Sequence, residues 1–227
     1  MKCDEKEEKR EKAFEPESPY VIICEGFQDR GLICALLKHL NITNCDVTFP
    51  KKRRDGANGK DAIFQVLNAV SGQKVAGESL GGLAVIRDAD DDPDVAFKET
   101  AERFPPPYTA PKKPFTIEKG KYRTGIFLIP GKSRTGTLDH LLLDAVAAKN
   151  QPVIDCINRL EACANWRVDW SSNKNAKMKM HCAVASFCKG DPGCSLGFIW
   201  SKGADNPMDI SSPVFKELAD FLNDFSK

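Results

Sequence analysis

The stretch "VIICEGFQDRGLICALLKHL" (21–40) decides how the ordered part of this chain begins to fold. Four apolar residues lead directly into Glu25 and Gly26, and a helical pattern of leucines and isoleucines follows. A short, continuous apolar run of this kind indicates a strand that is buried on both faces of a parallel sheet. Glu25 then stands where the strand leaves the sheet. Either it is a strand end that meets solvent, or it is a carboxylate that a metal ion or a substrate can reach.

The alternation of apolar runs and helical patterns continues to about residue 150. Further strands are expected at 46–49, 82–90 and 125–130. Helices are expected at 29–39, 61–72, 93–104 and 137–148. Strands that alternate with helices predict an α/β fold, here a Rossmann-like parallel sheet flanked by helices.

Beyond residue 150 the alternation stops, and three helical segments are expected, at 151–164, 174–188 and 212–226. We therefore expect three parts: a charged, solvated tail (1–18), an α/β core (19–150) and a mainly helical extension packed on that core (151–227).

The composition is that of a globular protein, with 41% hydrophobic and 29% charged residues in a chain of 227. No apolar run approaches the roughly 18 residues that cross a bilayer, and the charged N-terminus lacks a secretory signal pattern. We therefore expect a cytoplasmic protein without membrane contact. The nine cysteines include Cys24, Cys34, Cys156 and Cys163, which are expected to be buried and reduced.

The net charge of +1 conceals local asymmetry. Basic residues concentrate at 51–60, 112–125 and 131–136, and "DADDDPD" (88–94) is strongly acidic. Solvated loops would explain each basic run by itself. If the basic runs instead flank an acidic site, they would form a cradle for a polyanion.

Four acidic residues are expected at one edge of the sheet. Glu25 ends the first strand, Asp88 and Asp90 end the third, and Asp139 lies in the first turn of the helix after the fourth. Ligands bind outside the carboxyl ends of the strands in open parallel sheets. Two like charges about 4 Å apart repel by ~4 kcal/mol at an effective dielectric of 20. A bound proton would reduce that cost, and so would Mg²⁺, which prefers carboxylate oxygens.

The spacing of Asp88 and Asp90 supports a shared ion, because alternate residues of an extended strand point the same way. The acidic run 88–94 also has a simpler interpretation. Aspartates favour the positive end of a helix dipole, so the run would merely cap the following helix.

These strands and acids resemble the TOPRIM domain, which topoisomerases, bacterial-type primases and OLD-family nucleases share. The resemblance rests on "VIICEGFQD" (21–29), a strand ending in Glu-Gly with an aspartate three residues later, and on "LAVIRDAD" (83–90). The chain is most similar to a group of stand-alone bacterial TOPRIM-like proteins, through "GIFLIPGKSRTGTLDHLL" (125–142) and "MHCAVASFCKGDPGCSLGFIW" (180–200). It departs from the pattern at Asp139, where a glutamate is expected.

The resemblance implies nuclease or nicking chemistry on DNA or RNA, with Mg²⁺ or Mn²⁺ as cofactor. Asp88 and Asp90 would hold the metal, and Asp139 would help directly or through a water molecule. Glu25 would act as general acid/base or as a further ligand, for which neighbouring carboxylates should raise its pKa.

Lys132 and Arg134 would contact phosphate oxygens. The chain carries no ATPase module of the kind found in OLD nucleases, so an ATPase partner would be a separate subunit. Two other functions stay open: a non-catalytic binding or regulatory subunit with the TOPRIM fold, and an enzyme that transfers or hydrolyses phosphate groups on small molecules. Steep salt dependence of binding would distinguish a nucleic acid from a single phosphate group.

Overall fold

The computed structural model describes residues 14–50, 60–164, 169–187 and 206–227, and also residues 193, 196, 199 and 200. Its centre is a five-stranded sheet with the order β2-β1-β5-β7-β6. The strands are β1 (Tyr20–Cys24), β2 (Cys45–Thr48), β5 (Gly82–Asp88), β6 (Ile117–Lys119) and β7 (Arg123–Ile129). Neighbouring strands are parallel except β6, which is antiparallel to β7. The prediction of an α/β fold with a mainly parallel sheet is confirmed.

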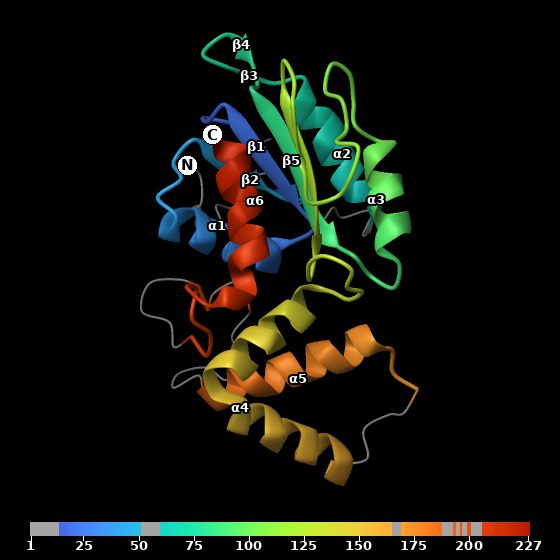
Figure 1. Ribbon diagram of the computed structural model, residues 1–227, viewed down its shortest axis with the longest axis vertical. Helices are drawn as coiled ribbons and strands as arrows, with labels where there is room; N and C mark the ends of the chain where they lie inside the picture. The colour runs from blue at the N-terminus through green and yellow to red at the C-terminus, as the bar shows by residue number, and fades with distance from the viewer. Residues whose placement is uncertain are drawn as a thin grey trace.

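Helices cover both faces of this sheet (Figure 1). One face packs against α1 (Phe27–His39) and α6 (Lys216–Ser226). The core on this side continues into α4 (Leu138–Ala164), α5 (Ser172–Phe187) and the short 3₁₀ helix η1 (Pro213–Phe215), and α4 and α5 lie below the sheet in Figure 1. The other face packs against α2 (Lys60–Ser71) and α3 (Pro93–Ala101). In β1, Ile22 belongs to the first core and Ile23 to the second, as the two-residue period of a strand requires.

The elements described from α4 onward are helices, as expected, and they belong to the same core. The expected division at residue 150 falls inside α4, at a kink where Asn150 has φ −151° and ψ 68° and Pro152 follows. The last helix, α6, returns to contact β7, and Leu222 and Phe225 are fully buried there. Among the described residues, none of the helices combines the length and the apolar character needed to cross a bilayer.

The N-terminal segment is attached to the sheet slightly earlier than expected. Ser18 is buried, and its hydroxyl donates to Asp46 Oδ1 at 2.9 Å. The backbone N–H groups of Glu17 and Ser18 donate to Asp46 Oδ2 at 2.6 and 2.8 Å. The last residues of the expected tail are therefore anchored on β2. Residues 1–13 lie outside the described part of the chain.

The cysteines differ from the expectation of buried, reduced thiols. Cys24 is buried and free, as expected. Cys34 is disulfide-bonded, although its burial on α1 is also typical of a reduced thiol. Cys156 and Cys163 are exposed, because they lie on the side of α4 that faces away from the core.

Candidate functional site

The sheet changes direction between β1 and β5. From β1 the chain passes through α1 to β2 on one side, and from β5 it passes through α3 to β7 on the other side. The two connecting helices cover opposite faces, so they diverge at the carboxyl ends of β1 and β5 (Figure 1). Such a topological switch point is the usual ligand site of an open parallel sheet.

Acidic residues gather at this point. Glu25 follows β1 directly, and its Oε1 accepts from the backbone N–H of Asp88 at 3.3 Å. Asp29, in the first turn of α1, is buried beside them. Its charge and that of Glu25 act on Asp88. The expected meeting of Glu25 and Asp88 is therefore present, and Asp29 joins them.

Burial and mutual repulsion shift the pKa values of this group. Burial, followed by the charge of Glu25, raises the pKa of Asp29 from 3.8 to about 7. Burial, followed by the charges of Asp29 and Glu25, raises the pKa of Asp88 well above its usual value. Burial and the neighbouring charges therefore favour the protonated forms of Asp29 and Asp88 when no cation is bound.

Asp139 completes the group from the first turn of α4. Its charge is the last of the causes that raise the pKa of Asp29, after burial and the charge of Glu25. The neighbouring Leu138 donates its backbone N–H to Asp88 Oδ1 at 2.9 Å. Within the described residues, Oδ1 of Asp29 and Oδ1 of Asp139 are buried without a hydrogen-bond partner. Such orphaned oxygens are rare, and they are available to a bound cation or water.

A buried arginine, Arg87, lies under the acidic edge. Its side chain is fully buried on the α3 side of the sheet, with contacts of 3.4 Å to Glu25, 3.7 Å to Asp90 and 3.5 Å to Glu99. These distances exceed the about 2.7–2.9 Å of a strong charge-assisted hydrogen bond. The positive charge of Arg87 therefore compensates the negative charges of Glu25 and Asp90 from the α3 side of the sheet. Asp88, which contacts Leu138, and Asp29, which belongs to α1, lie on the opposite side. The sequence signal for this residue is a charged side chain inside the apolar run "LAVIRD" (83–88).

Asp90 does not share the direction of Asp88. The strand ends at Asp88, and Asp90 has a positive φ of 51°. Its Oδ2 lies 3.7 Å from Arg87, and its backbone forms a two-way bridge with Gly136. The assumption that the "DAD" spacing continues an extended strand is wrong, because the left-handed turn at Asp90 interrupts the alternation. The charge of Asp90 still raises the pKa of Asp88.

The capping interpretation of the acidic run holds for Asp92. Its Oδ1 accepts from the backbone N–H groups of Asp94 and Val95, both at 3.0 Å, and Pro93 opens α3. The run therefore has two uses: Asp88 belongs to the acidic edge, and Asp92 begins the next helix.

Lys132 and Arg134 lie in the loop between β7 and α4. Lys132 is exposed, and its backbone N–H donates to Glu217 Oε2 at 2.9 Å. The Arg134 guanidinium is paired with Asp144 at 2.5 Å. The bridge between Gly136 and Asp90 attaches this loop to the acidic edge. Lys132 is therefore open to a ligand, whereas Arg134 would have to leave Asp144.

Within the described residues, the basic side chains at the end of β6 and the start of β7 do not flank the acidic edge. Lys119, Lys121 and Arg123 lie at the amino end of β7, away from the acids. Lys119 pairs there with Asp224 at 2.7 Å. Residues 51–59 lie outside the described part of the chain.

The oxygen donors suit Mg²⁺ or Mn²⁺ in kind, but a complete ligand set is not assembled. In the described ranges, no three His, Cys, Asp or Glu side chains are grouped to hold a metal ion. Mg²⁺ normally takes only one or two carboxylates and fills its shell with waters and phosphate oxygens. The unpartnered oxygens of Asp29 and Asp139 beside Asp88 meet that smaller requirement.

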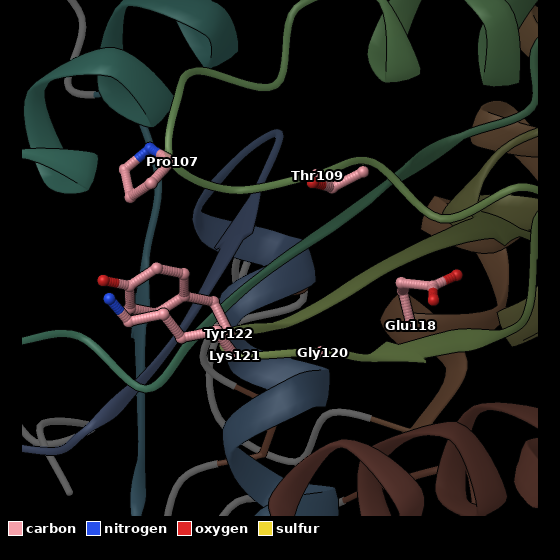
Figure 2. Close-up of a pocket in the computed structure, with 6 residues that line it drawn as sticks. All are labelled: Pro107, Thr109, Glu118, Gly120, Lys121 and Tyr122. Carbon is pink, nitrogen blue, oxygen red and sulfur yellow. The ribbon is translucent and has the colours of Figure 1, made fainter.

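A pocket lies at the other end of the sheet (Figure 2). It is lined by Pro107, Thr109, Glu118, Gly120, Lys121 and Tyr122. Its charged residues, Glu118 and Lys121, belong to β6 and the turn after it. This pocket shares no residue with the acidic edge.

Residues 19–227 match the family described as "Protein of unknown function (DUF3226)", and the chain belongs to this family. No curated protein and no solved structure matches it.

Proposed function

We propose that the acidic edge is a TOPRIM-like site for Mg²⁺- or Mn²⁺-dependent cleavage of phosphodiester bonds in DNA or RNA. The observation that carries the proposal is the meeting of Glu25, Asp29, Asp88 and Asp139 at the β1/β5 switch point, with buried oxygens that lack a partner. A fold keeps such mutually repelling groups together at a cost, which a cation would offset.

In this proposal Asp88 and Asp139 hold the metal, and the unpartnered Oδ1 of Asp29 is a further oxygen donor. Asp90 serves as a more distant ligand that must turn away from Arg87. The metal would supply charge for a phosphate and an activated water. Glu25 stands about one-third exposed at the same edge, within reach of a substrate as general acid/base, and Arg87 holds its carboxylate in place. Lys132 is the first candidate for phosphate contact, and an ATPase, if required, would be a separate subunit.

The test is cleavage of plasmid DNA, single-stranded DNA and RNA with Mg²⁺ or Mn²⁺, compared with the same reactions in EDTA. Asp88→Asn should abolish cleavage and Glu25→Gln should lower it by about 10²–10⁴-fold. Asp224→Asn, at a surface ion pair on α6, should leave it unchanged. Cleavage that survives Asp88→Asn, or that needs no metal, would overturn the proposal.

A non-catalytic binding or regulatory subunit is the second candidate. It is favoured by Arg87, which already compensates Glu25 and Asp90, and by the incomplete ligand set among the described residues. A binding subunit should retain its partner after Glu25→Gln and Asp88→Asn, and it should show no turnover with either metal.

A further inference from the structure

The helix α5 carries a cationic surface that leads to the acidic edge. Its 16 residues, Ser172–Phe187, include three lysines and one histidine but no acid. Lys174, Lys177 and His181 are exposed, and their spacing of three and four residues places them on one side of the helix. They span roughly 10 Å of helix, about the length of three phosphates along one nucleic-acid strand.

These lysines differ from the paired lysine on the same helix. Lys179 is bound to Glu161 at 2.7 Å and to Asn158 at 3.0 Å, which fastens α5 to α4. Lys174 and Lys177 have no such carboxylate among the described residues. Exposed cations without a protein partner remain available to an external anion.

The beginning of α5 is tied to the turn that carries Asp139. The backbone N–H of Thr137 donates to His140 Nδ1 at 3.1 Å, so Nδ1 of the neutral ring is an acceptor and Nε2 carries the proton. Nε2 lies 3.0 Å from Ser172 Oγ and donates to it. This contact connects the first turns of α4 and α5, and Figure 1 shows the two helices packed below the carboxyl ends of the strands.

The charges of α5 also act on the acidic edge. Burial raises the pKa of Asp139, and the positive charges of Lys177 and then His181 lower it. The lysine and histidine side chains of α5 therefore act electrostatically on an acid of the site.

We propose that the exposed face of α5 formed by Lys174, Lys177 and His181 binds the phosphate backbone of a nucleic acid and directs it to the acidic edge. This inference rests on the proposed function for the choice of ligand and assigns the substrate-binding surface of that site. Contacts with phosphates give affinity and position without reading sequence.

The experiment measures binding of fluorescein-labelled oligonucleotides, single-stranded and duplex, in EDTA at a series of salt concentrations. Each lysine–phosphate contact contributes about 0.7–0.9 to the slope of log K against log salt. The double variant Lys174→Gln/Lys177→Gln should therefore reduce the magnitude of this slope by about 1.4–1.8. It should also weaken binding on the order of 30-fold at 0.1 M salt. Lys174→Arg/Lys177→Arg should restore both.

The matched control is Lys74→Gln/Lys121→Gln, which removes the same charge from two exposed lysines at the opposite end of the sheet. It should leave the slope unchanged, and circular dichroism should show that every variant is folded. An equal loss in the control, or no loss in the α5 variant, would overturn the inference.

Cleavage measured separately distinguishes this inference from the proposed function. If the wild type cleaves but binding does not depend on α5, the inference fails alone. If binding depends on α5 but no metal supports cleavage, the enzymatic proposal fails alone and the surface assignment is supported. If the wild type binds no oligonucleotide, both are overturned.

Discussion

Arg87 is a single buried cation that compensates the negative charges of several carboxylates at the acidic edge. It is fully buried, and its three carboxylate partners, Glu25, Asp90 and Glu99, are 31%, 38% and 43% exposed. Removing one member of a buried ion pair typically costs 3–5 kcal/mol because a charge is left uncompensated. These partly hydrated carboxylates place the cost at the lower end of that range.

Arg87→Met should therefore lower the free energy of unfolding by about 3 kcal/mol, measured by urea denaturation. Arg134→Met is the matched control, because its pair with Asp144 is 46% and 43% exposed. The control should change stability by less than about 1 kcal/mol. Equal effects of the two substitutions would show that Arg87 does not act as the internal counter-charge.

Asp29 provides a pH dependence with a defined sign. Its pKa is raised from 3.8 to about 7 in the folded chain, so the folded state binds more protons than the unfolded state between those values. Stability contributed by the protonated form is complete below pH 3.8 and is lost as the pH rises toward 7. The loss is about 1.4 kcal/mol per pH unit at most.

Asp29→Asn, which mimics the protonated carboxyl group, should be more stable than the wild type at both pH 5 and pH 8, and its advantage should be clearly larger at pH 8, because the wild type continues to lose stability up to about pH 7. Urea denaturation in EDTA between these two pH values measures the difference. A variant whose stability follows the wild type at every pH would contradict the assigned shift.

At the scale of the elements, α6 closes the α1 side of the sheet. Phe225 is fully buried, and its ring meets that of Tyr20 edge to face with centroids 5.5 Å apart. Phe225→Ala should cost about 3–5 kcal/mol in unfolding free energy, because it leaves a cavity between α6 and β1. Asp224→Ala, beside it on the exposed side, should cost less than about 1 kcal/mol. A small effect of Phe225→Ala would mean that α6 is detachable from the core.

The strands that the hydrophobic pattern predicted are those that contain a run of apolar residues. The strands β1, β5 and β7 are continuous apolar runs, and each was expected within two residues of its observed bounds. The short pair β3 (Lys74–Val75) and β4 (Glu78–Ser79) and the edge strand β6 were missed. They are two or three residues long and mostly polar or half-exposed, so cross-strand pairing rather than composition defines them.

For the candidate site, the sequence predicts which acids stand at the ends of strands but not how their side chains are arranged. The alternation of strands and helices predicts parallel strands but does not determine their order in the sheet. In any parallel order, Glu25 and Asp88 lie at the same edge, because both stand at the carboxyl end of a strand. The turn at Asp90 and the approach of Asp29 depend on local backbone geometry, which spacing does not encode. The lysines of α5 give no local charge run, because they are separated along the sequence and become neighbours only on the helix surface.

At the scale of the whole molecule, stability should report the binding of a divalent cation even without cleavage. A ligand at 100 times its dissociation constant stabilises the folded state by about 2.7 kcal/mol. Mg²⁺ or Mn²⁺ should therefore raise the melting temperature of the wild type, and the rise should be larger at pH 8 than at pH 6. The reason is that the cation must displace the protons held by Asp29 and Asp88.

The informative quantity is the shift in melting temperature that the metal induces, since Asp88→Asn also changes the stability of the metal-free protein. That shift should disappear in Asp88→Asn and persist in Asp224→Asn, which alters only a surface pair. The same shift in both variants, or one that is independent of pH, would mean that the cation binds elsewhere on the molecule. The convergence of acids at the β1/β5 switch point would then have to be explained by protons alone, and the binding-subunit interpretation would become the stronger one.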